Sequence, residues 1–434
     1  MSPGVRELWC ELAWLGDAAP APAVSLGIAG DRIATVEAGG APPPGAERLR
    51  GLTIPGLVNA HSHSFQRALR GRTQSASGGD FWSWREEMYA LALRLDPDSV
   101  FAVARATFGE MALAGITSVG EFHYLHHGVD GVPYDDPNAL GNAIIAAAAE
   151  AGVRLTLIDA CYLHGGIDRF RDRSAEAWAE RVGGLGGGPL QRVGAAIHSV
   201  RAVDPAAAAT VAAWAGERPL HAHVSEQPAE NESCLAEHGL TPTALLGEAG
   251  ALGPGFTAIH ATHPTDADVE LLGAARAGCC LCPTTERDLA DGIGPARALR
   301  DAGVGLSTGS DSQAFIDPFE EARAIELDER LATGVRGTHE PRDLLRAATA
   351  GGARAIGWHE AGRIEAGALA DLTTISLDGP RLAGLPASQA IPGVVFAAAP
   401  PDVRDVMVGG RWIVRDGAHA GLDVAALLAE TLPR

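Results

Sequence analysis

Two histidines separated by one residue, His61 and His63, follow an apolar, β-branched segment at residues 53–60. Alternate side chains of an extended segment point to the same side, so two such imidazoles can bind one metal ion. The pair is weak evidence by itself, because two surface histidines, or one buried and one exposed histidine, give the same pattern. The histidine pair predicts a metal site only if further ligands occur at the ends of other strands.

Polar residues that could complete a site follow three more predicted strands. His223 lies in the segment 221–226, His260 follows the next strand, and Asp311 lies between two serines after the last strand. A barrel that serves only as a scaffold would rarely carry such a set of residues at its strand ends by chance. These residues therefore strengthen the interpretation of the histidine pair as part of a metal site.

The predicted ligands are three histidines and one carboxylate: His61, His63, His223 and Asp311. This donor set suits zinc, with iron or manganese as alternatives, and leaves a position for a water whose pKa falls to about 7. All 34 basic residues are arginine, so no lysine is present to bridge two metal ions, and we expect one metal ion per chain. The same absence excludes Schiff-base and pyridoxal phosphate chemistry, because both need a lysine amine.

Eight strands separated by helical segments must position these residues. Ala-Gly pairs at residues 114–115, 151–152, 277–278 and 302–303 mark places where a helix ends and a strand begins, because glycine adopts the left-handed cap conformation without steric penalty. The alternation predicts an α/β fold, a closed parallel (β/α)8 TIM-like barrel, with its chemistry at the carboxyl ends of the strands. We expect the barrel to occupy residues 53–360 and its first strand to begin near Thr53-Ile54.

The two ends of the chain have a different pattern. Residues 1–52 and 361–434 carry turn residues and short apolar runs, which predict a small composite β-sandwich domain built from both termini. The segment from Gln66 to Arg94 is too long for a tight loop and includes the aromatic run Phe81 to Arg85. We expect this segment to lie over the site as a lid.

The composition limits the partners of the chain. With 434 residues and a net charge of −20, the protein lacks the basic excess that binding to nucleic acid or an anionic membrane requires, so we expect a small substrate. No signal peptide or apolar run of about 20 residues is apparent, which favours a soluble cytoplasmic protein.

Residues 279–282, with three cysteines, fall where the seventh strand is expected and are interpreted as buried packing. We expect His123, His126 and His127 to be loop residues.

These residues, together with the segments 54–60 and 362–372, resemble the amidohydrolase superfamily over nearly the whole chain. The resemblance implies hydrolysis at carbon bonded to nitrogen or phosphorus. Residues 61–71, 81–89 and 223–232 resemble more narrowly the formimidoylglutamate deiminases of histidine degradation, which convert N-formimino-L-glutamate into N-formyl-L-glutamate and ammonia. The resemblance also implies a homodimer.

Hydrolysis of a formimino group needs hydroxide, an acceptor for the water proton and a donor to the leaving nitrogen. Asp311 can accept the proton while it binds the metal, and His260 can polarise or orient the water. Glu226, three residues after His223, is placed to protonate the substrate nitrogen and the departing ammonia. The alternative role for Glu226 is to orient a metal ligand.

The two carboxylates of such a substrate need local cations in a strongly acidic protein, and the planar guanidinium suits them. Arg85 and Arg201 are the candidates, supported by the resemblance. The resemblance adds Tyr124 and His198 as hydrogen-bonding neighbours and Gln66 near the formimino group.

Two other functions stay open from the sequence. An aminohydrolase of the same fold could act on a purine, pyrimidine or triazine ring, which would not need two converging arginines. A barrel without catalysis could serve as a scaffold, although its sequence would be expected to lack ligands.

Overall fold

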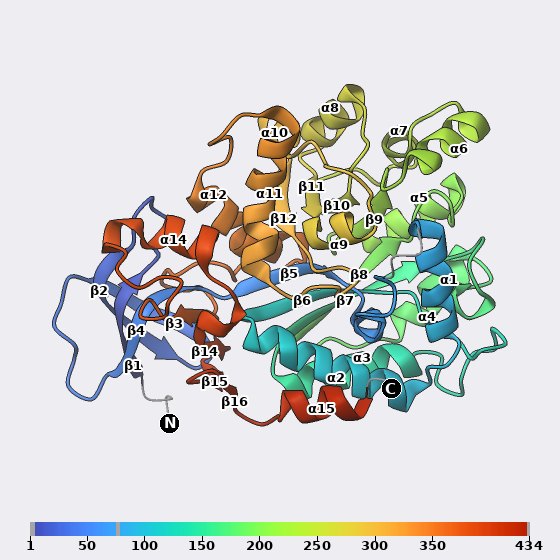
Figure 1. The fold of residues 1–434 in the computed structure, drawn as a ribbon. Coiled ribbons are helices and arrows are strands. Elements are labelled where there is room, and N and C mark those ends of the chain that lie inside the picture. The colour runs from blue at the N-terminus through green and yellow to red at the C-terminus, as the bar shows by residue number, and fades with distance from the viewer. Residues whose placement is uncertain (1–4, 75–78, 432–434) are drawn as a thin grey trace.

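The computed structural model describes residues 5–74 and 79–431 and contains two eight-stranded sheets (Figure 1). The strands of the terminal sheet are β1 (Arg6–Ala13), β2 (Ala21–Ala29), β3 (Arg32–Ala38), β4 (Glu47–Pro55), β13 (Leu372–Ile375), β14 (Val403–Val408), β15 (Arg411–Arg415) and β16 (Ala418–His419). The strands of the barrel are β5 (Leu57–Ser62), β6 (Ile116–His123), β7 (Arg154–Cys161), β8 (Gln191–Ile197), β9 (Leu220–Val224), β10 (Phe256–His260), β11 (Gly278–Leu281) and β12 (Gly305–Thr308).

Helices separate most of the barrel strands and continue to the end of the described chain. They are α1 (Phe81–Ala92), α2 (Pro97–Leu113), α3 (Ala139–Ala151), α4 (Ala175–Gly183), α5 (Pro205–Ala215), α6 (Pro228–His238), α7 (Pro242–Glu248), α8 (Asp266–Ala274), α9 (Pro283–Asp288), α10 (Ala296–Asp301), α11 (Pro318–Thr333), α12 (Pro341–Arg346), α13 (Gly352–Ala355), α14 (Ala390–Ala397) and α15 (Val424–Thr431). None of the helices in the described ranges is long and apolar enough to span a membrane.

The eight barrel strands pair in chain order, and every pair is parallel. The first and last strands approach at their carboxyl ends, where Asp311 N donates to His61 O and His63 N donates to Asp311 O, both at 3.0 Å. The predicted (β/α)8 barrel is therefore confirmed, and its closure joins two segments that carry predicted metal ligands.

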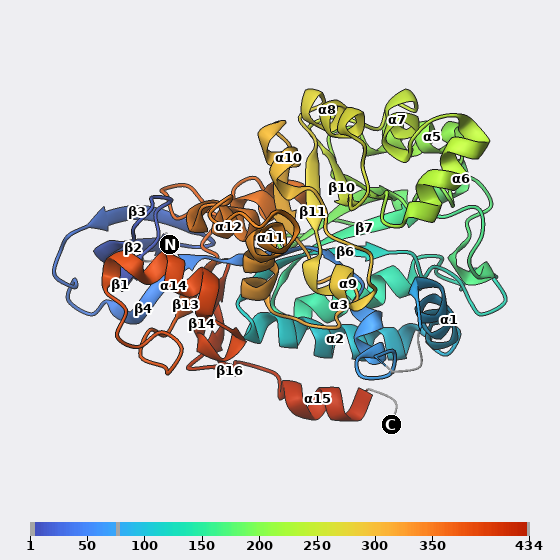
Figure 2. The same cartoon turned by 45° about the horizontal axis from the view of Figure 1, so that its top comes forward.

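The terminal sheet combines both ends of the chain, as predicted. β4 lies between β1, to which it is parallel, and β13, to which it is antiparallel. Both views show the N-terminal and C-terminal strands together at one end of the barrel (Figures 1 and 2). The small core of this sheet includes Leu8, Leu26 and Ile33, while the main core fills the barrel and the layer beneath its helices.

The predicted start of the first barrel strand is wrong by a few residues. Thr53 and Ile54 lie in β4 of the terminal sheet, and the barrel begins only at Leu57 in β5. Gly56 separates the two strands, and a Cβ at this position would lie 2.2 Å from the Thr117 side chain. The apolar pattern runs through this change of sheet without a break, so the pattern alone does not reveal it.

Glycines end the helices before three barrel strands, as predicted. Gly115, Gly152 and Gly303 have φ values of 90°, 76° and 85° before β6, β7 and β12. At the fourth predicted place Arg276 takes the left-handed conformation with φ 54°, and Gly278 is already part of β11. The predicted alternation of helix and strand therefore holds there, although another residue ends the helix.

Helix α1 begins at a local signal in the segment after β5. Asp80 accepts a hydrogen bond from Ser83 N at 2.9 Å, and Ser83 Oγ accepts one from Asp80 N at 2.8 Å. This reciprocal arrangement satisfies backbone donors at the helix start. It starts α1 at Phe81, and the helix then presents Phe81 and Trp84 of the aromatic run to the carboxyl end of the barrel.

Candidate metal centre and active site

The four predicted metal ligands meet at the carboxyl end of the barrel. His61 lies in β5 and His63 follows it, His223 lies in β9, and Asp311 follows β12. We call these four residues the metal-site cluster. All four side chains are buried, with relative exposures of 0% for His61, 4% for His63, 6% for His223 and 5% for Asp311.

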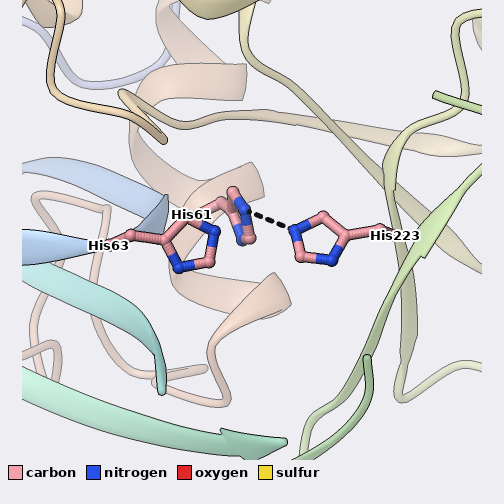
Figure 3. A group of neighbouring side chains, drawn as sticks. All are labelled: His61, His63 and His223. Carbon is pink, nitrogen blue, oxygen red and sulfur yellow. Dashed lines mark hydrogen bonds between the residues drawn. The ribbon is translucent and has the colours of Figure 1, made fainter. Parts of the chain in front are cut away.

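The ligand atoms of the metal-site cluster point toward one another. Asp311 Oδ1 lies 3.3 Å from His61 Nε2 and 3.2 Å from His63 Nε2. His223 Nε2 lies 3.2 Å from His61 Nε2, as the dashed line in Figure 3 shows. Figure 3 also shows the three imidazoles converging from two different strands.

Backbone carbonyls determine which ring nitrogen faces the cluster. His63 Nδ1 donates to Phe122 O at 2.8 Å, and His223 Nδ1 donates to His198 O at 2.9 Å. A carbonyl only accepts, so each Nδ1 carries the hydrogen and each Nε2 presents a lone pair to the cluster. Burial lowers the pKa of His61 to about 3 and also lowers the pKa values of His63 and His223. The three imidazoles are therefore neutral donors at neutral pH.

This geometry fits a divalent metal ion. Ligand atoms around a tetrahedral zinc with bonds of about 2.0–2.2 Å lie roughly 3.3–3.6 Å apart, close to the separations in the metal-site cluster. His223 Nε2 presents a lone pair toward His61 Nε2, and a cation bound between the two nitrogens would satisfy both in this buried place. Three neutral nitrogens and one carboxylate oxygen are donors that zinc, iron and manganese accept.

Strained backbone accompanies the cluster. Ser225, His260 and Asp311 have positive φ values of 51°, 68° and 45°, a region that non-glycine residues seldom adopt. Such conformations persist only where the surrounding structure enforces them, and they gather at functional sites. At Asp311 the enforcing contacts are the two backbone hydrogen bonds that close the barrel.

A hydrogen-bonded frame beneath the ligands connects β5, β6 and the segment after β12. Glu121 accepts hydrogen bonds from Ser62 Oγ at 2.5 Å, and from Ser64 N and Oγ at 2.6 Å each. Gln313 donates to Ser62 Oγ at 2.9 Å and to Asp311 O at 2.8 Å. Burial raises the pKa of Glu121 to about 7, against the lowering effect of the serine donors. The frame fixes the segments that carry His61, His63 and Asp311.

His260 faces three carboxylates. Its Nε2 lies 3.6 Å from Asp311 Oδ2 and 3.7 Å from Glu226 Oε1, while its Nδ1 lies 3.3 Å from Glu286 Oε1. Burial lowers the pKa of His260, but the neighbouring carboxylates outweigh burial and raise this pKa well above its usual value. The arrangement can hold a proton on His260 beside the metal-site cluster.

Glu226 connects His260 with Arg201. Its Oε2 lies 3.4 Å from Arg201 Nη2, and Glu230, which is 2% exposed, places Oε1 3.8 Å from Arg201 Nε. Burial raises the pKa of Glu226, partly opposed by His260 and Arg201. A buried carboxyl with a raised pKa can carry a proton to a reacting nitrogen.

A pocket of about 170 Å³ opens beside the metal-site cluster. Its lining consists of His63, Gln66, Phe81, Trp84, Arg85, Met88, Tyr89, Tyr124, Tyr162, His164, Gly165, Gly166, Phe170, His198, Ser199, Arg201, Ala202, His223, Glu226, His260, Leu289 and Asp311. Helix α1 supplies five of these residues, so the segment predicted to cover the site forms one wall of the pocket. Residues 75–78 of that segment lie outside the described residues.

The five predicted substrate-binding residues all line this pocket. The Arg85 guanidinium lies over Trp82 at 4.4 Å and Tyr89 at 5.5 Å, and within the described ranges it has no carboxylate partner. Gln66 Nε2 donates to Tyr124 Oη at 2.7 Å, while Gln66 Oε1 is buried and has no partner among described residues.

His198 stands between the pocket and the metal-site cluster. Its ring centre lies 4.3 Å from that of Tyr162 and 5.2 Å from that of His223. Its backbone oxygen holds His223, so this residue contributes both to the pocket wall and to the orientation of a predicted ligand.

A second buried group of histidines and aspartates lies between β6, β7 and α4. We call it the arginine-closed cluster, and its members are His123, His126, His127, Asp159, Asp172 and Arg181. One ligand atom from each of His123, His126 and Asp159 lies within 4.8 Å of the others, a spacing that a metal ion could use. However, Arg181 already donates to both oxygens of Asp159 at 2.9 and 3.0 Å and to both oxygens of Asp172 at 2.8 and 3.0 Å. The guanidinium therefore occupies the place of a cation.

The expectation for the three histidines after the second barrel strand needs correction. His123 ends β6 and is not a loop residue, whereas His126 and His127 lie in the loop but are buried with exposures of 1% and 4%. Asp159, Asp172 and Arg181 lie 32 to 58 residues from these histidines in the chain, so no sequence pattern indicated the group. Cys279 and Cys280 of the seventh strand and Cys282 directly after it are buried, as expected.

Comparisons with known proteins agree with this geometry. Residues 52–413 match the Amidohydrolase family. A formimidoylglutamate deiminase from Pseudomonas aeruginosa is 40% identical over 405 residues, which cover 88% of this chain and 89% of that protein. A 5-methylthioadenosine/S-adenosylhomocysteine deaminase from Natronomonas pharaonis is 32% identical over 87% of this chain and 85% of its own length. The crystal structure of an amidohydrolase from Brucella melitensis superposes with a TM-score of 0.91 at 34% identity and covers 98% of this chain and 99% of that one.

Proposed function

The chain belongs to the amidohydrolase family, and within that family we propose that it hydrolyses N-formimino-L-glutamate to N-formyl-L-glutamate and ammonia. One observation supports this substrate most: Arg85 and Arg201 line the same narrow pocket as the metal-site cluster. The 40% identity to a formimidoylglutamate deiminase supports the same substrate. Membership of the family indicates a hydrolytic enzyme. Its substrate, the linear amidine N-formimino-L-glutamate, is our proposal.

The metal-site cluster would hold one divalent ion, which we propose is zinc, through His61, His63, His223 and Asp311. A bound divalent metal polarises a water molecule and lowers its pKa towards neutrality. The surrounding carbonyls of Phe122 and His198 keep the imidazole lone pairs directed at that place. This orientation depends only on buried backbone groups and does not require the substrate.

Asp311 is the proposed acceptor of the proton that the attacking water loses. Burial raises its pKa, but the hydrogen bond and charge interaction with His61, together with His260 and His63, lower it well below the usual range, so the carboxylate is ionised. His260, 3.6 Å from Asp311 Oδ2, orients the water beside it. As the water oxygen bonds to the formimino carbon, Glu226 donates a proton to the nitrogen. The proton that Asp311 took from the water then passes to the same nitrogen, the carbon–nitrogen bond breaks to release ammonia, and the hydroxyl proton of the adduct returns to Glu226.

The two carboxylates of the substrate are proposed to bind the two pocket arginines. Without substrate, Arg85 lies against aromatic rings and Arg201 lies near the carboxylates of Glu226 and Glu230. A planar guanidinium can bind a carboxylate through two parallel hydrogen bonds. A substrate carboxylate at Arg201 would also leave Glu226 free to face the reacting nitrogen.

A ring substrate is the competing possibility, because a relative at 32% identity is a 5-methylthioadenosine/S-adenosylhomocysteine deaminase. The pocket volume of about 170 Å³ is below the roughly 300–1,000 Å³ common for sites that enclose drug-sized ligands. A compact linear dianion suits this volume and the two arginines better than a nucleoside does.

An ammonia-release assay tests the proposal with N-formimino-L-glutamate beside 5-methylthioadenosine. We expect turnover of the linear amidine only, and we expect the double variant Arg85→Met, Arg201→Met to raise KM for it at least ~100-fold, because charge-assisted hydrogen bonds are lost. Arg287→Met is the matched control, since Arg287 pairs with Glu320 and Asp328 outside the pocket. Unchanged KM in the double variant, or turnover of the nucleoside alone, would overturn the proposal.

A further inference from the structure

Arg169 is a fully buried arginine beside the pocket, with 0% exposure. It lies in the short 3₁₀ helix Asp168–Phe170, which follows β7. Within the described part of the chain, its side chain forms no salt bridge with a carboxylate. Taking a guanidinium out of water without a counter-ion is unfavourable unless its donors are satisfied in another way.

Backbone oxygens of two other segments accept hydrogen bonds from Arg169. Its Nη1 donates to Leu95 O at 2.9 Å and also to Ala92 O, and its Nε donates to His127 O at 3.0 Å. In return, the backbone oxygen of Arg169 accepts hydrogen bonds from His126 N at 3.1 Å and His127 N at 2.9 Å. Arg169 thus joins the loop after β7 to the loop after β6 and to the end of α1.

The end of α1 is a favourable place for this buried charge. The last four carbonyls of a helix have no partner within the helix, and the helix dipole makes this end negative. Ala92 is the last residue of α1, and Leu95 lies in the turn that follows. The carbonyls at this helix end therefore take the place of a carboxylate partner for the guanidinium. The five donors of a guanidinium can reach several carbonyls at once, which the three donors of a lysine ammonium cannot match.

The segments that Arg169 joins form much of the pocket wall. Phe170, the next residue, lines the pocket and packs with its ring centre 5.0 Å from Tyr124 and 5.8 Å from Tyr89. Helix α1 contributes Arg85 and Tyr89 to the same pocket. A shift at the end of α1 would move these side chains relative to the metal-site cluster, which rests on a separate frame around Glu121.

We propose that Arg169 is a positioning residue that holds α1 against the barrel and thereby sets the affinity of the pocket for its anionic substrate. The substrate part of this inference rests on the proposed function, whereas the position of α1 does not. Arg169 contacts no residue of the metal-site cluster, so its loss leaves metal binding intact. Its loss weakens substrate binding more than it slows the chemical step.

Hydrogen exchange of the α1 amides tests the structural part without any substrate. In Arg169→Met we expect peptides from residues 81–95 to exchange about 10-fold faster or more, the scale of one lost hydrogen bond to a charged group. Barrel peptides from β9 and β10 keep their exchange rates. Arg171→Met is the matched control, because Arg171 lies two residues away, is 38% exposed and pairs with Asp168 at the surface.

Steady-state kinetics with N-formimino-L-glutamate test the functional part. Arg169→Met is expected to raise KM about 10-fold or more, with kcat changed by less than about 3-fold and metal content unchanged. Arg169→Lys keeps the charge but can reach fewer carbonyls, so its KM and α1 exchange rate fall between those of the unmodified protein and Arg169→Met. If Arg169→Met does not fold, the same measurements on Arg169→Lys and Arg169→Gln test the inference.

Two results would overturn this inference. One is α1 exchange and KM in the Arg169 variants equal to those of Arg171→Met. The other is an equal loss of protection in α1 and in the barrel, which would mean that Arg169 stabilises the whole fold without a particular role at α1. If the unmodified protein releases no ammonia from the linear amidine, the proposed function fails. The α1 exchange rates would still test whether Arg169 holds α1 in position.

Discussion

Two buried groups of histidine and aspartate in this protein differ in what balances their negative charge. In the metal-site cluster, Asp311 meets the histidines His61, His63 and His260, and within the described residues no arginine reaches it. In the arginine-closed cluster, Asp159 and Asp172 share the guanidinium of Arg181. Both groups contain histidines whose pKa values are lowered by burial.

The difference shows what turns a histidine–aspartate group into a metal site. A ligand needs an oxygen or nitrogen lone pair that no other group occupies, and Arg181 occupies the lone pairs of Asp159 and Asp172. In the metal-site cluster no arginine among the described residues pairs with the ligands, so the Nε2 lone pairs of His63 and His223 are open to a metal ion. Residue types and spacing alone make the two groups look alike, whereas the presence of an internal cation separates them.

The largest effect is expected from removing the charge of Asp311. Asp311→Asn should lower kcat by about 10⁴-fold, the upper end of the range for a lost acid–base group, because the carboxylate is both a ligand and the proton acceptor. Asp172→Asn is the control in the other cluster and should keep kcat within about 10-fold if its protein folds. Ammonia release under saturating substrate measures both. A near-normal rate in Asp311→Asn would remove this residue from the mechanism.

Removing the internal cation of the other cluster should affect stability. Arg181→Met is expected to lower the free energy of unfolding by about 3–5 kcal/mol, because Asp159 and Asp172 remain as buried charges without a partner. Urea unfolding of the chelator-treated protein measures this change. The triple variant Arg181→Met, Asp159→Asn, Asp172→Asn should recover part of the loss, and a loss below about 1 kcal/mol in the single variant would contradict the role of Arg181.

The smallest effect concerns the pH dependence of stability. Burial lowers the pKa of His126 to about 4, whereas the unfolded chain takes up this proton near pH 6.5. Stability is therefore lost as the pH falls from about 6.5 to 4, because only the unfolded chain binds the proton in that window. His126→Gln should make the pH slope of the unfolding free energy shallower by about 1 kcal/mol per pH unit, with its amide still able to donate to Ala160 O. An unchanged slope would show that His126 is not buried in its neutral form.

Much of the site could be predicted because barrel topology brings together residues that strand ends carry. The spacing of His61 and His63 and the positions of His223 and Asp311 near the carboxyl ends of strands were sufficient to expect one cluster. Sequence reasoning missed the groups that hold this cluster, since Glu121, Gln313 and Glu286 make contacts that only the closed barrel creates.

The fold shows the same limit. The alternation of helices and strands predicted the barrel, and the short apolar runs at both ends predicted the composite terminal sheet. The apolar run through Thr53 and Leu57, however, concealed the change from one sheet to the other at Gly56. Arg169 and Arg181 were not distinguishable from surface arginines, because their partners are backbone carbonyls and carboxylates of other segments of the chain. The positive φ value at Asp311 likewise accompanies the backbone hydrogen bonds that close the barrel and does not follow from residue type.

The most direct test of the account is the metal content of protein purified without chelators, measured together with ammonia release before and after removal of the metal. We expect about one equivalent of divalent metal per chain, loss of ammonia release on chelation and its return when zinc is added, with little metal retained by Asp311→Asn. The second cluster adds no equivalent, because Arg181 closes it. Less than about half an equivalent of metal, with ammonia release that persists after chelation, would contradict the central claim that the metal-site cluster is the catalytic centre.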